Sequence, residues 1–72
     1  MNFKDFLIVE FLDAQRYYIN SNNTNLSRFP NPEKDIFGYS VDFVDVGIQY
    51  IWQQWQRSAE ITLRQVNKLI EK

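Results

Sequence analysis

The chain has 72 residues, enough for one small domain with a marginal core. It contains neither cysteine nor histidine, which excludes disulfides, thiolate and imidazole metal ligands, thiol nucleophiles and the commonest proton shuttle at neutral pH. Eight basic and nine acidic residues give a net charge of −1, too balanced for a generic nucleic-acid binder. With 44% apolar residues, including six Phe, four Tyr and two Trp, the composition predicts a folded protein that works through contact.

The first predicted element is a helix from about residue 3 to 19. Asn2 is placed to cap its first turn, and Asp5 lies near its positive end. A strand over residues 6–12 is the alternative, because its β-branched residues favour sheets, but nothing else in the chain offers it a partner of similar quality. The helical spacing is carried by Phe3, Phe6, Leu7, Phe11, Ala14, Tyr17 and Tyr18.

Residues 20–39 are predicted to form a long connection. Asparagine, serine and threonine cluster in residues 20–25, and Pro30, Pro32 and Gly38 follow, which is the chemistry of turns and loops. Loops longer than about 12 to 15 residues are uncommon in compact domains unless they are functional or held in place. We expect this loop to be anchored to the core by Leu26, Phe29, Ile36 and Phe37.

A second helix is predicted from about residue 41 to 70, with Ser40 as its N-cap and two aspartates near its positive end. Such a helix spans about 45 Å, against about 26 Å for the first. Either it breaks, near Gly47 or in residues 56–58, or its C-terminal half carries an unpartnered apolar stripe. The apolar positions are Val41, Val44, Ile48, Trp52, Trp55, Ala59, Leu63, Val66 and Ile70.

These elements predict an all-α fold in a single domain over residues 1–72: a small helical hairpin with a short N-terminal helix and a long C-terminal helix joined by a long anchored loop. Exposing a large aliphatic side chain forfeits roughly 1.5 to 3 kcal/mol relative to burying it. The C-terminal half of the second helix therefore predicts association, in the form of a twofold homodimer.

No local pattern indicates catalysis, a metal site or a cofactor site. Two glycines cannot make a glycine-rich phosphate loop, and Asp42 and Asp45 are interpreted as charge at a helix N-terminus. Arg57, Arg64 and Lys68 share a helical face, but Glu60 precedes Arg64 by four residues in the order that favours an ion pair. We predict a solvated face there, no nucleic-acid binding, no enzyme activity and no catalytic, cofactor or metal residues.

The aromatic cluster of Tyr50, Trp52 and Trp55 has two interpretations, which both hold if one stripe serves the core and a partner. Two tryptophans three residues apart commonly build a core, while Trp and Tyr are also enriched at interface hot spots. The predicted partner-binding residues are Tyr50, Trp52, Arg57, Leu63, Arg64, Val66, Lys68 and Ile70.

Residues 46–57 read Val-Gly-Ile-Gln-Tyr-Ile-Trp-Gln-Gln-Trp-Gln-Arg, with Tyr39 shortly before them. Their pattern is an aliphatic residue, Gln, two residues, Trp, two residues and Trp-Gln. This pattern resembles the C-terminal signature of small accessory proteins encoded by tailed phages and prophages of Gram-negative bacteria. Ile51 and Gln54 stand where that family usually has alanine. The similarity covers fewer than about 20 residues of the chain.

Small phage proteins of this kind commonly inhibit or modify host machinery, anti-CRISPR proteins among them. The resemblance implies a phage-derived protein that binds and inhibits a host protein complex, in the cytoplasm of the bacterial host. Residues 1–5 lack an export pattern, and no window approaches the roughly 20 mostly apolar residues of a membrane-spanning helix, so we expect no membrane association. A self-assembling structural phage protein without a host target is the alternative.

Overall fold

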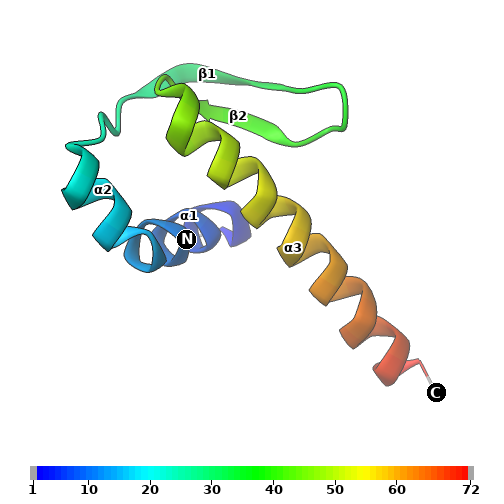
Figure 1. Cartoon of the computed structure of the whole chain (residues 1–72). Coiled ribbons are helices and arrows are strands. Elements are labelled where there is room, and N and C mark those ends of the chain that lie inside the picture. Colours follow the sequence, from blue (N-terminus) through cyan, green and yellow to red (C-terminus); the bar gives the residue numbers. More distant parts are fainter. Residues whose placement is uncertain (1, 72) are drawn as a thin grey trace.

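The computed structural model describes residues 2–71, and within them it has helices α1 (Phe3–Ala14), α2 (Arg16–Asn22) and α3 (Val46–Ile70) and strands β1 (Arg28–Lys34) and β2 (Ser40–Phe43) (Figure 1). The two strands form an antiparallel hairpin. The prediction of an all-α fold is therefore wrong. The hairpin occupies the stretch that was expected to be a loop and the first turn of the second helix.

Two prolines in β1 explain why this strand was not predicted. Pro30 and Pro32 have no N–H for a ladder, which argues against a central strand. They are tolerated because β1 is an edge strand of a two-stranded sheet, and because the register is irregular between Arg28 and Glu33, on either side of the prolines. The paired positions are Arg28 with Phe43, Glu33 with Val41, and Lys34 with Ser40.

The turn of the hairpin is held by Asp35. Its Oδ1 accepts the backbone N–H groups of Phe37 at 2.8 Å and Tyr39 at 2.9 Å. Its backbone carbonyl accepts the N–H of Gly38 at 3.0 Å. Gly38 has φ 87°, in the left-handed region that other residues rarely adopt. Asp35 and Gly38 thus set the turn by local chemistry, without help from the core.

The anchoring expected of this segment is also wrong. Leu26, Phe29, Ile36 and Phe37 are all exposed, and Ile36 retains 93% of its accessible surface. The hairpin is attached instead through β2, whose Phe43 is buried. Of the four expected anchors only Phe29 lies in a strand, and every residue of β1 is exposed. Ile36 and Phe37 lie in the turn that Asp35 holds outside the core.

Helix α3 begins at Val46, five residues later than predicted. Asp45 is its N-cap, with Oδ1 accepting the N–H of Ile48 at 3.0 Å. Ser40, the predicted cap, lies in β2. Asp45 and not Ser40 therefore caps the helix, because residues 40–43 pair with β1 as a strand.

The break considered near Gly47 or in residues 56–58 does not occur, since α3 is continuous to Ile70. Gly47 lies in its first turn, where an added Cβ would be 3.0 Å from the hydroxyl oxygen of Tyr18. The glycine serves close packing of α2 against the start of α3 and not a kink.

The predicted helix over residues 3–19 is divided at Gln15 into α1 and α2. Asn2 caps α1 by accepting the N–H of Asp5 at 2.8 Å. Helix α2 runs to Asn22 and is closed by Asn23, whose φ of 48° is left-handed.

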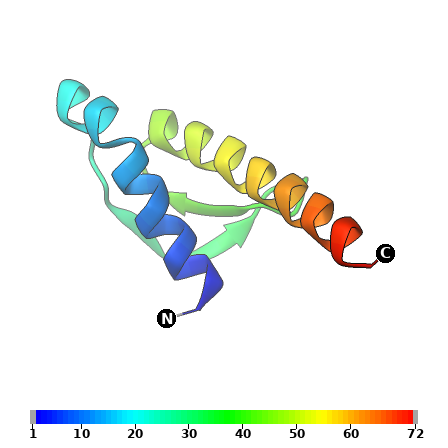
Figure 2. The same cartoon turned by 90° about the horizontal axis from the view of Figure 1, so that it is seen from below.

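The core lies where α1, β2 and the first half of α3 meet, and both α1 and α3 lie on the same side of the hairpin (Figure 2). The Phe11 ring is its centre, with centroids 5.0 Å from Trp52, 5.7 Å from Trp55 and 6.0 Å from Phe43. Tilted and edge-on aromatic contacts at such distances add to simple burial. The buried apolar residues are Ile8, Phe11, Phe43, Ile48 and Trp52.

Candidate functional site

A fully buried carboxylate joins α1, β2 and α3. Asp42 accepts a hydrogen bond from the indole Nε1 of Trp52 on Oδ2, at 2.6 Å. The Lys4 Nζ lies 2.8 Å from Oδ1 and also donates to Ser40 Oγ at 3.0 Å, while an Arg28 nitrogen lies 3.8 Å from Oδ1. No directed hydrogen bond reaches Oδ1, so Lys4 balances its charge as an ion pair.

Burial raises the pKa of Asp42, but the polar groups of Lys4, Trp52 and Ser40 beside the carboxylate, together with the Lys4 charge, outweigh burial and hold the pKa below its usual range. The carboxylate is therefore ionised at neutral pH, and its buried charge is compensated. An ionised carboxylate closed off from solvent fastens three elements together and does not reach a substrate. Across residues 2–71 no cluster of three acidic side chains is arranged to hold a metal ion.

Two glutamines of α3 complete the free edge of β2. Gln49 Oε1 accepts the N–H groups of Asp42 and Phe43, both at 3.0 Å, and Gln56 Oε1 accepts the N–H of Ser40 at 2.9 Å. Both side-chain amides donate to the Ser40 carbonyl, at 3.2 Å and 2.9 Å. Because the two glutamines are seven residues apart, they project from one face of α3, which takes the place of a third strand.

The Trp-x-x-Trp-Gln segment therefore has an architectural role. Trp52 binds the Asp42 carboxylate, Trp55 packs edge-on against Phe11 while partly exposed, and Gln56 pairs with β2. Trp52 was predicted to bind a partner, and this is wrong because its side chain is fully buried. Trp52 therefore belongs to the core, whereas Trp55 packs on the core and keeps part of its ring exposed.

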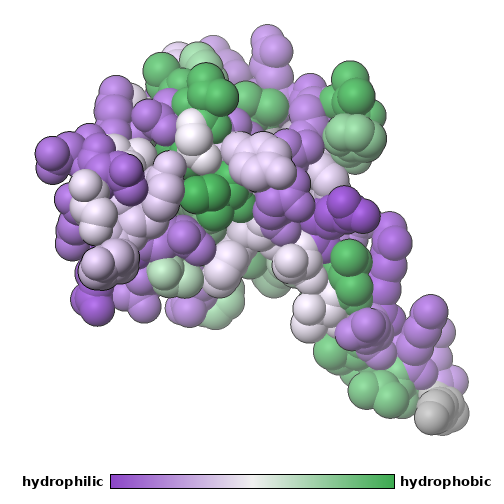
Figure 3. Space-filling model, viewed as in Figure 1, coloured by the Kyte–Doolittle hydropathy of each residue, from purple (hydrophilic) through white to green (hydrophobic). Residues whose placement is uncertain are grey.

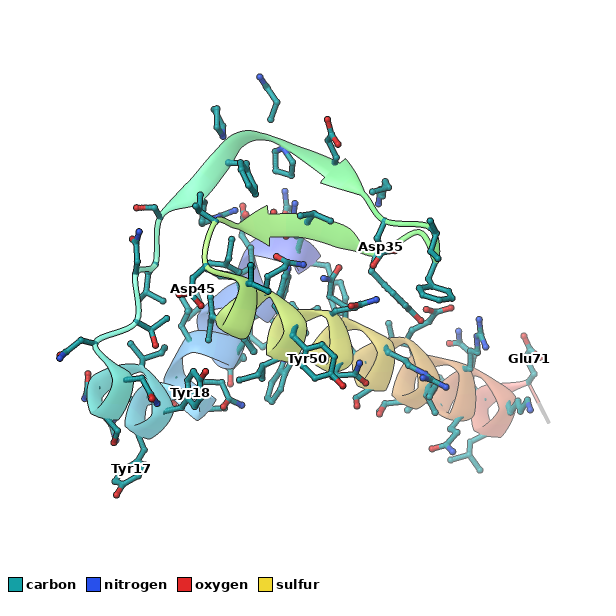
Figure 4. The ribbon with its side chains drawn as sticks, turned by 45° about the horizontal axis from the view of Figure 1, so that its top comes forward. Tyr17, Tyr18, Asp35, Asp45, Tyr50 and Glu71 are labelled. Atoms are coloured by element: carbon teal, nitrogen blue, oxygen red, sulfur yellow. The ribbon has the colours of Figure 1, made fainter. Side chains whose placement is uncertain are left out.

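A different surface lies at the tip of the hairpin. We define the tip surface as Ile36, Phe37 and Tyr39 of the hairpin with Gln53, Arg57 and Arg64 of α3. Ile36 and Phe37 keep 93% and 69% of their accessible surface, and a hydrophobic patch is visible at the hairpin end (Figure 3). Asp35, which holds the turn, lies directly at this end (Figure 4). A hollow between hairpin and helix is lined by Phe37, Tyr39, Gln53, Gln54, Arg57, Glu60, Ile61 and Arg64.

Among the described residues, the hollow contains one arginine without an ion-pair partner. Arg64 forms an ion pair with Glu60, four residues before it, as predicted. Burial raises the pKa of the Tyr39 hydroxyl, and the neighbouring Glu60 carboxylate raises it further, so the phenol stays protonated and can donate. Within residues 2–71, Arg57 enters no ion pair. Arg57 is thus available to a partner's carboxylate or carbonyl group.

The predicted partner-binding residues do not form one site. Arg57 and Arg64 belong to the tip surface, while Tyr50 is exposed on another part of α3. Lys68 is exposed farther along the helix. The remaining three, Leu63, Val66 and Ile70, are exposed on the C-terminal part of α3.

Sequence reasoning missed Ile36 and Phe37. The signal was the spacing of Asp35 and Gly38, which encloses two residues and is typical of a tight turn. A turn fixed by its own side chain and glycine displays the residues between them, whatever their hydrophobicity.

The C-terminal part of α3 extends beyond the body of the protein (Figure 1), and every residue from 61 to 70 is exposed. We call residues 61–70 the tail. An apolar groove between α1 and α3 adjoins it, lined by Phe3, Leu7, Trp55, Ser58, Ala59, Thr62 and Leu63. One apolar face of α3, the tail stripe, runs from this groove to the helix end and consists of Ala59, Thr62, Leu63, Val66, Leu69 and Ile70.

Comparison with known proteins finds no matching family model, no matching curated protein and no matching solved structure. Among the helices of residues 2–71, none combines the length and the apolar character needed to cross a bilayer. The tip surface and the tail are therefore the two exposed apolar surfaces that can bind a partner.

Proposed function

We propose that this is a non-catalytic, phage-derived protein that binds a host protein complex in the bacterial cytoplasm and inhibits it, as an anti-defence or anti-CRISPR protein. The observation that carries the proposal is the tip surface. Asp35 and Gly38 fix a turn that keeps Ile36 and Phe37 exposed to solvent and contributes nothing to the core. An ordered apolar tip of this kind suits insertion into a partner.

The tip surface defines the chemistry of the partner. Phe37 would fit an apolar pocket of the partner. Arg57, which lines the same hollow as Phe37, would bind a carboxylate or a carbonyl oxygen close to that pocket. The Tyr39 hydroxyl and the amide of Gln53 add polar contacts at the rim. A protein surface supplies this mixture of apolar and acidic groups.

The phage origin is supported by the resemblance of residues 46–57. The structure gives those residues an architectural role, in which Trp52 and Gln56 attach the hairpin to α3. The shared segment thus supports a common scaffold, while the target is chosen by the tip surface, whose apolar residues Ile36 and Phe37 lie outside that segment.

Co-purification from bacteria that express a tagged chain and a CRISPR effector tests the proposal. We expect the wild type to retain a host complex in a fixed ratio, and Ile36→Ser combined with Phe37→Ser to lose it. The matched control is Tyr17→Ser combined with Val46→Ser, which removes two side chains that are 86% and 83% exposed elsewhere. Tyr17 points away from the body (Figure 4). Equal loss in both variants, or no host partner for the wild type, contradicts the proposal.

A second candidate is the self-assembling structural protein without a host target, which the tail favours. Leu63, Val66 and Ile70 form an apolar stripe that the other residues between 2 and 71 leave exposed. We propose accordingly that the protein is a homodimer in either role. Self-association in every preparation, with no host protein retained, selects the structural role.

A further inference from the structure

The exposed stripe of the tail continues the buried stripe of α3. Spacings of four and three alternate without interruption along the helix, which is the repeat of a coiled-coil seam. The first part of the seam is covered by α1 and β2, and the second part is bare. Its positions are Ile48, Trp52, Trp55, Ala59, Thr62, Val66 and Leu69.

The charges of the tail lie away from this stripe. At about 100° per residue, every charged side chain from Arg57 to Glu71 is about 120° or more from the centre of the stripe. Ser58 and Gln65, which are uncharged, flank one side, and Asn67 lies on the other. Two copies of the stripe can therefore face each other without bringing like charges together, whereas an acidic or basic partner would find no counter-charge beside it.

The body restricts how two stripes can pair. Helix α1 already covers the seam where Phe11 meets Trp52 and Trp55. A parallel pair would superimpose these covered halves and leave both grooves empty. An antiparallel pair places the bare end of each helix beside the groove of the other.

We propose that two copies pair in antiparallel fashion, with the tail of each in the groove between α1 and α3 of the other. This arrangement rests on the proposed homodimer and specifies its register. The twofold axis passes between Thr62 and Leu63, midway between the start of the groove at Trp55 and the helix end at Ile70. Each of these limits lies 7.5 residues, or about 11 Å, from the axis.

The register also matches side-chain sizes. Val66 of one copy faces Ala59 of the second, so a branched side chain meets a small one. Ile70 faces Trp55, whose partly exposed ring lines the groove together with Phe3. Large residues packed against small ones give the close interdigitation that a stable interface requires.

Sedimentation velocity at tens of micromolar tests whether the dimer forms. We expect a dimer for the wild type and at least a tenfold weaker association for Val66→Glu. Ile61→Glu is the matched control, because Ile61 and Val66 are 43% and 44% exposed but Ile61 faces the tip hollow, so this variant should remain dimeric. A monomeric wild type overturns the homodimer and the arrangement together.

Disulfide trapping tests the register, and the absence of native cysteine makes it specific. Thr62→Cys, beside the axis, should cross-link to itself under mild oxidation. Ala59→Cys and Val66→Cys should each remain largely uncross-linked alone but form a heterodimeric disulfide when mixed. Self-linking of both single variants, with no preference for the mixed pair, would retain the homodimer and overturn the antiparallel arrangement.

Discussion

The two halves of α3 carry the same apolar stripe and meet opposite surroundings. In the first half, Ile48 and Trp52 are fully buried, and the glutamines on the neighbouring face bind β2. In the tail, residues 61–70 are exposed throughout. The comparison shows that periodicity specifies which face of a helix is apolar, while neighbouring elements determine whether that face is buried in the monomer.

The largest expected effect is that of Trp52→Ala. It removes the largest buried side chain and the hydrogen bond to Asp42, so we expect a loss of about 3 to 5 kcal/mol in the free energy of unfolding. Leu69→Ala, in the exposed tail, should change the stability of the monomer by no more than about 0.5 kcal/mol. Urea denaturation at low protein concentration measures both, and similar losses would erase the contrast between the two halves.

The second prediction concerns the ion pair between Lys4 and Asp42, next to the first half of α3. Lys4→Met leaves the buried Asp42 carboxylate without its main counter-charge. Because Lys4 is partly exposed, we expect a loss of about 1 to 3 kcal/mol, below the full cost of an unpaired buried charge. Lys34→Met, on the exposed strand β1, is the control, and thermal unfolding should leave it close to wild type.

The third prediction tests the attachment of β2 to α3. Gln56→Ala leaves the backbone N–H of Ser40 without its partner, at a cost of about 1 to 2 kcal/mol. Gln54→Ala, which removes an exposed glutamine of the same helix, should cost less than about 0.5 kcal/mol. Hydrogen exchange gives an independent measurement, since the Ser40 amide should exchange faster only in Gln56→Ala.

The smallest expected effect is a pH dependence. The pKa of Asp42 is lower in the folded chain than its ordinary value of about 3.9, so its contribution to stability is complete above that value and is lost as the pH falls through the folded pKa. Denaturant titrations from neutral pH to about pH 2 should show a steeper loss for wild type than for Asp42→Asn. Parallel curves would mean that the carboxylate is not preferentially ionised in the fold.

Much of the core could be predicted from the sequence, but the hairpin could not. The spacing of Phe11 and Trp52 within their helical stripes marked both as core candidates, and both are buried. The proline residues of β1 concealed the strand, because only a pairing partner can show that those positions fall where no ladder hydrogen bond is needed. The tip residues Ile36 and Phe37 were assigned to the core because hydrophobicity suggested burial, whereas the Asp35 turn displays them.

By itself the sequence determined the helical faces, the Asn2 cap, the Glu60 pair with Arg64 and the absence of thiol and imidazole chemistry, because these depend on residue type and on spacings of a few positions. Tertiary structure alone decided that β2 replaces the start of the second helix, that Gln49 and Gln56 complete its edge, and that the stripe of α3 is covered only in its first half. The physical reason is that a backbone donor or an apolar face gains free energy only from the group that reaches it, and for these residues that group lies in another element of the fold.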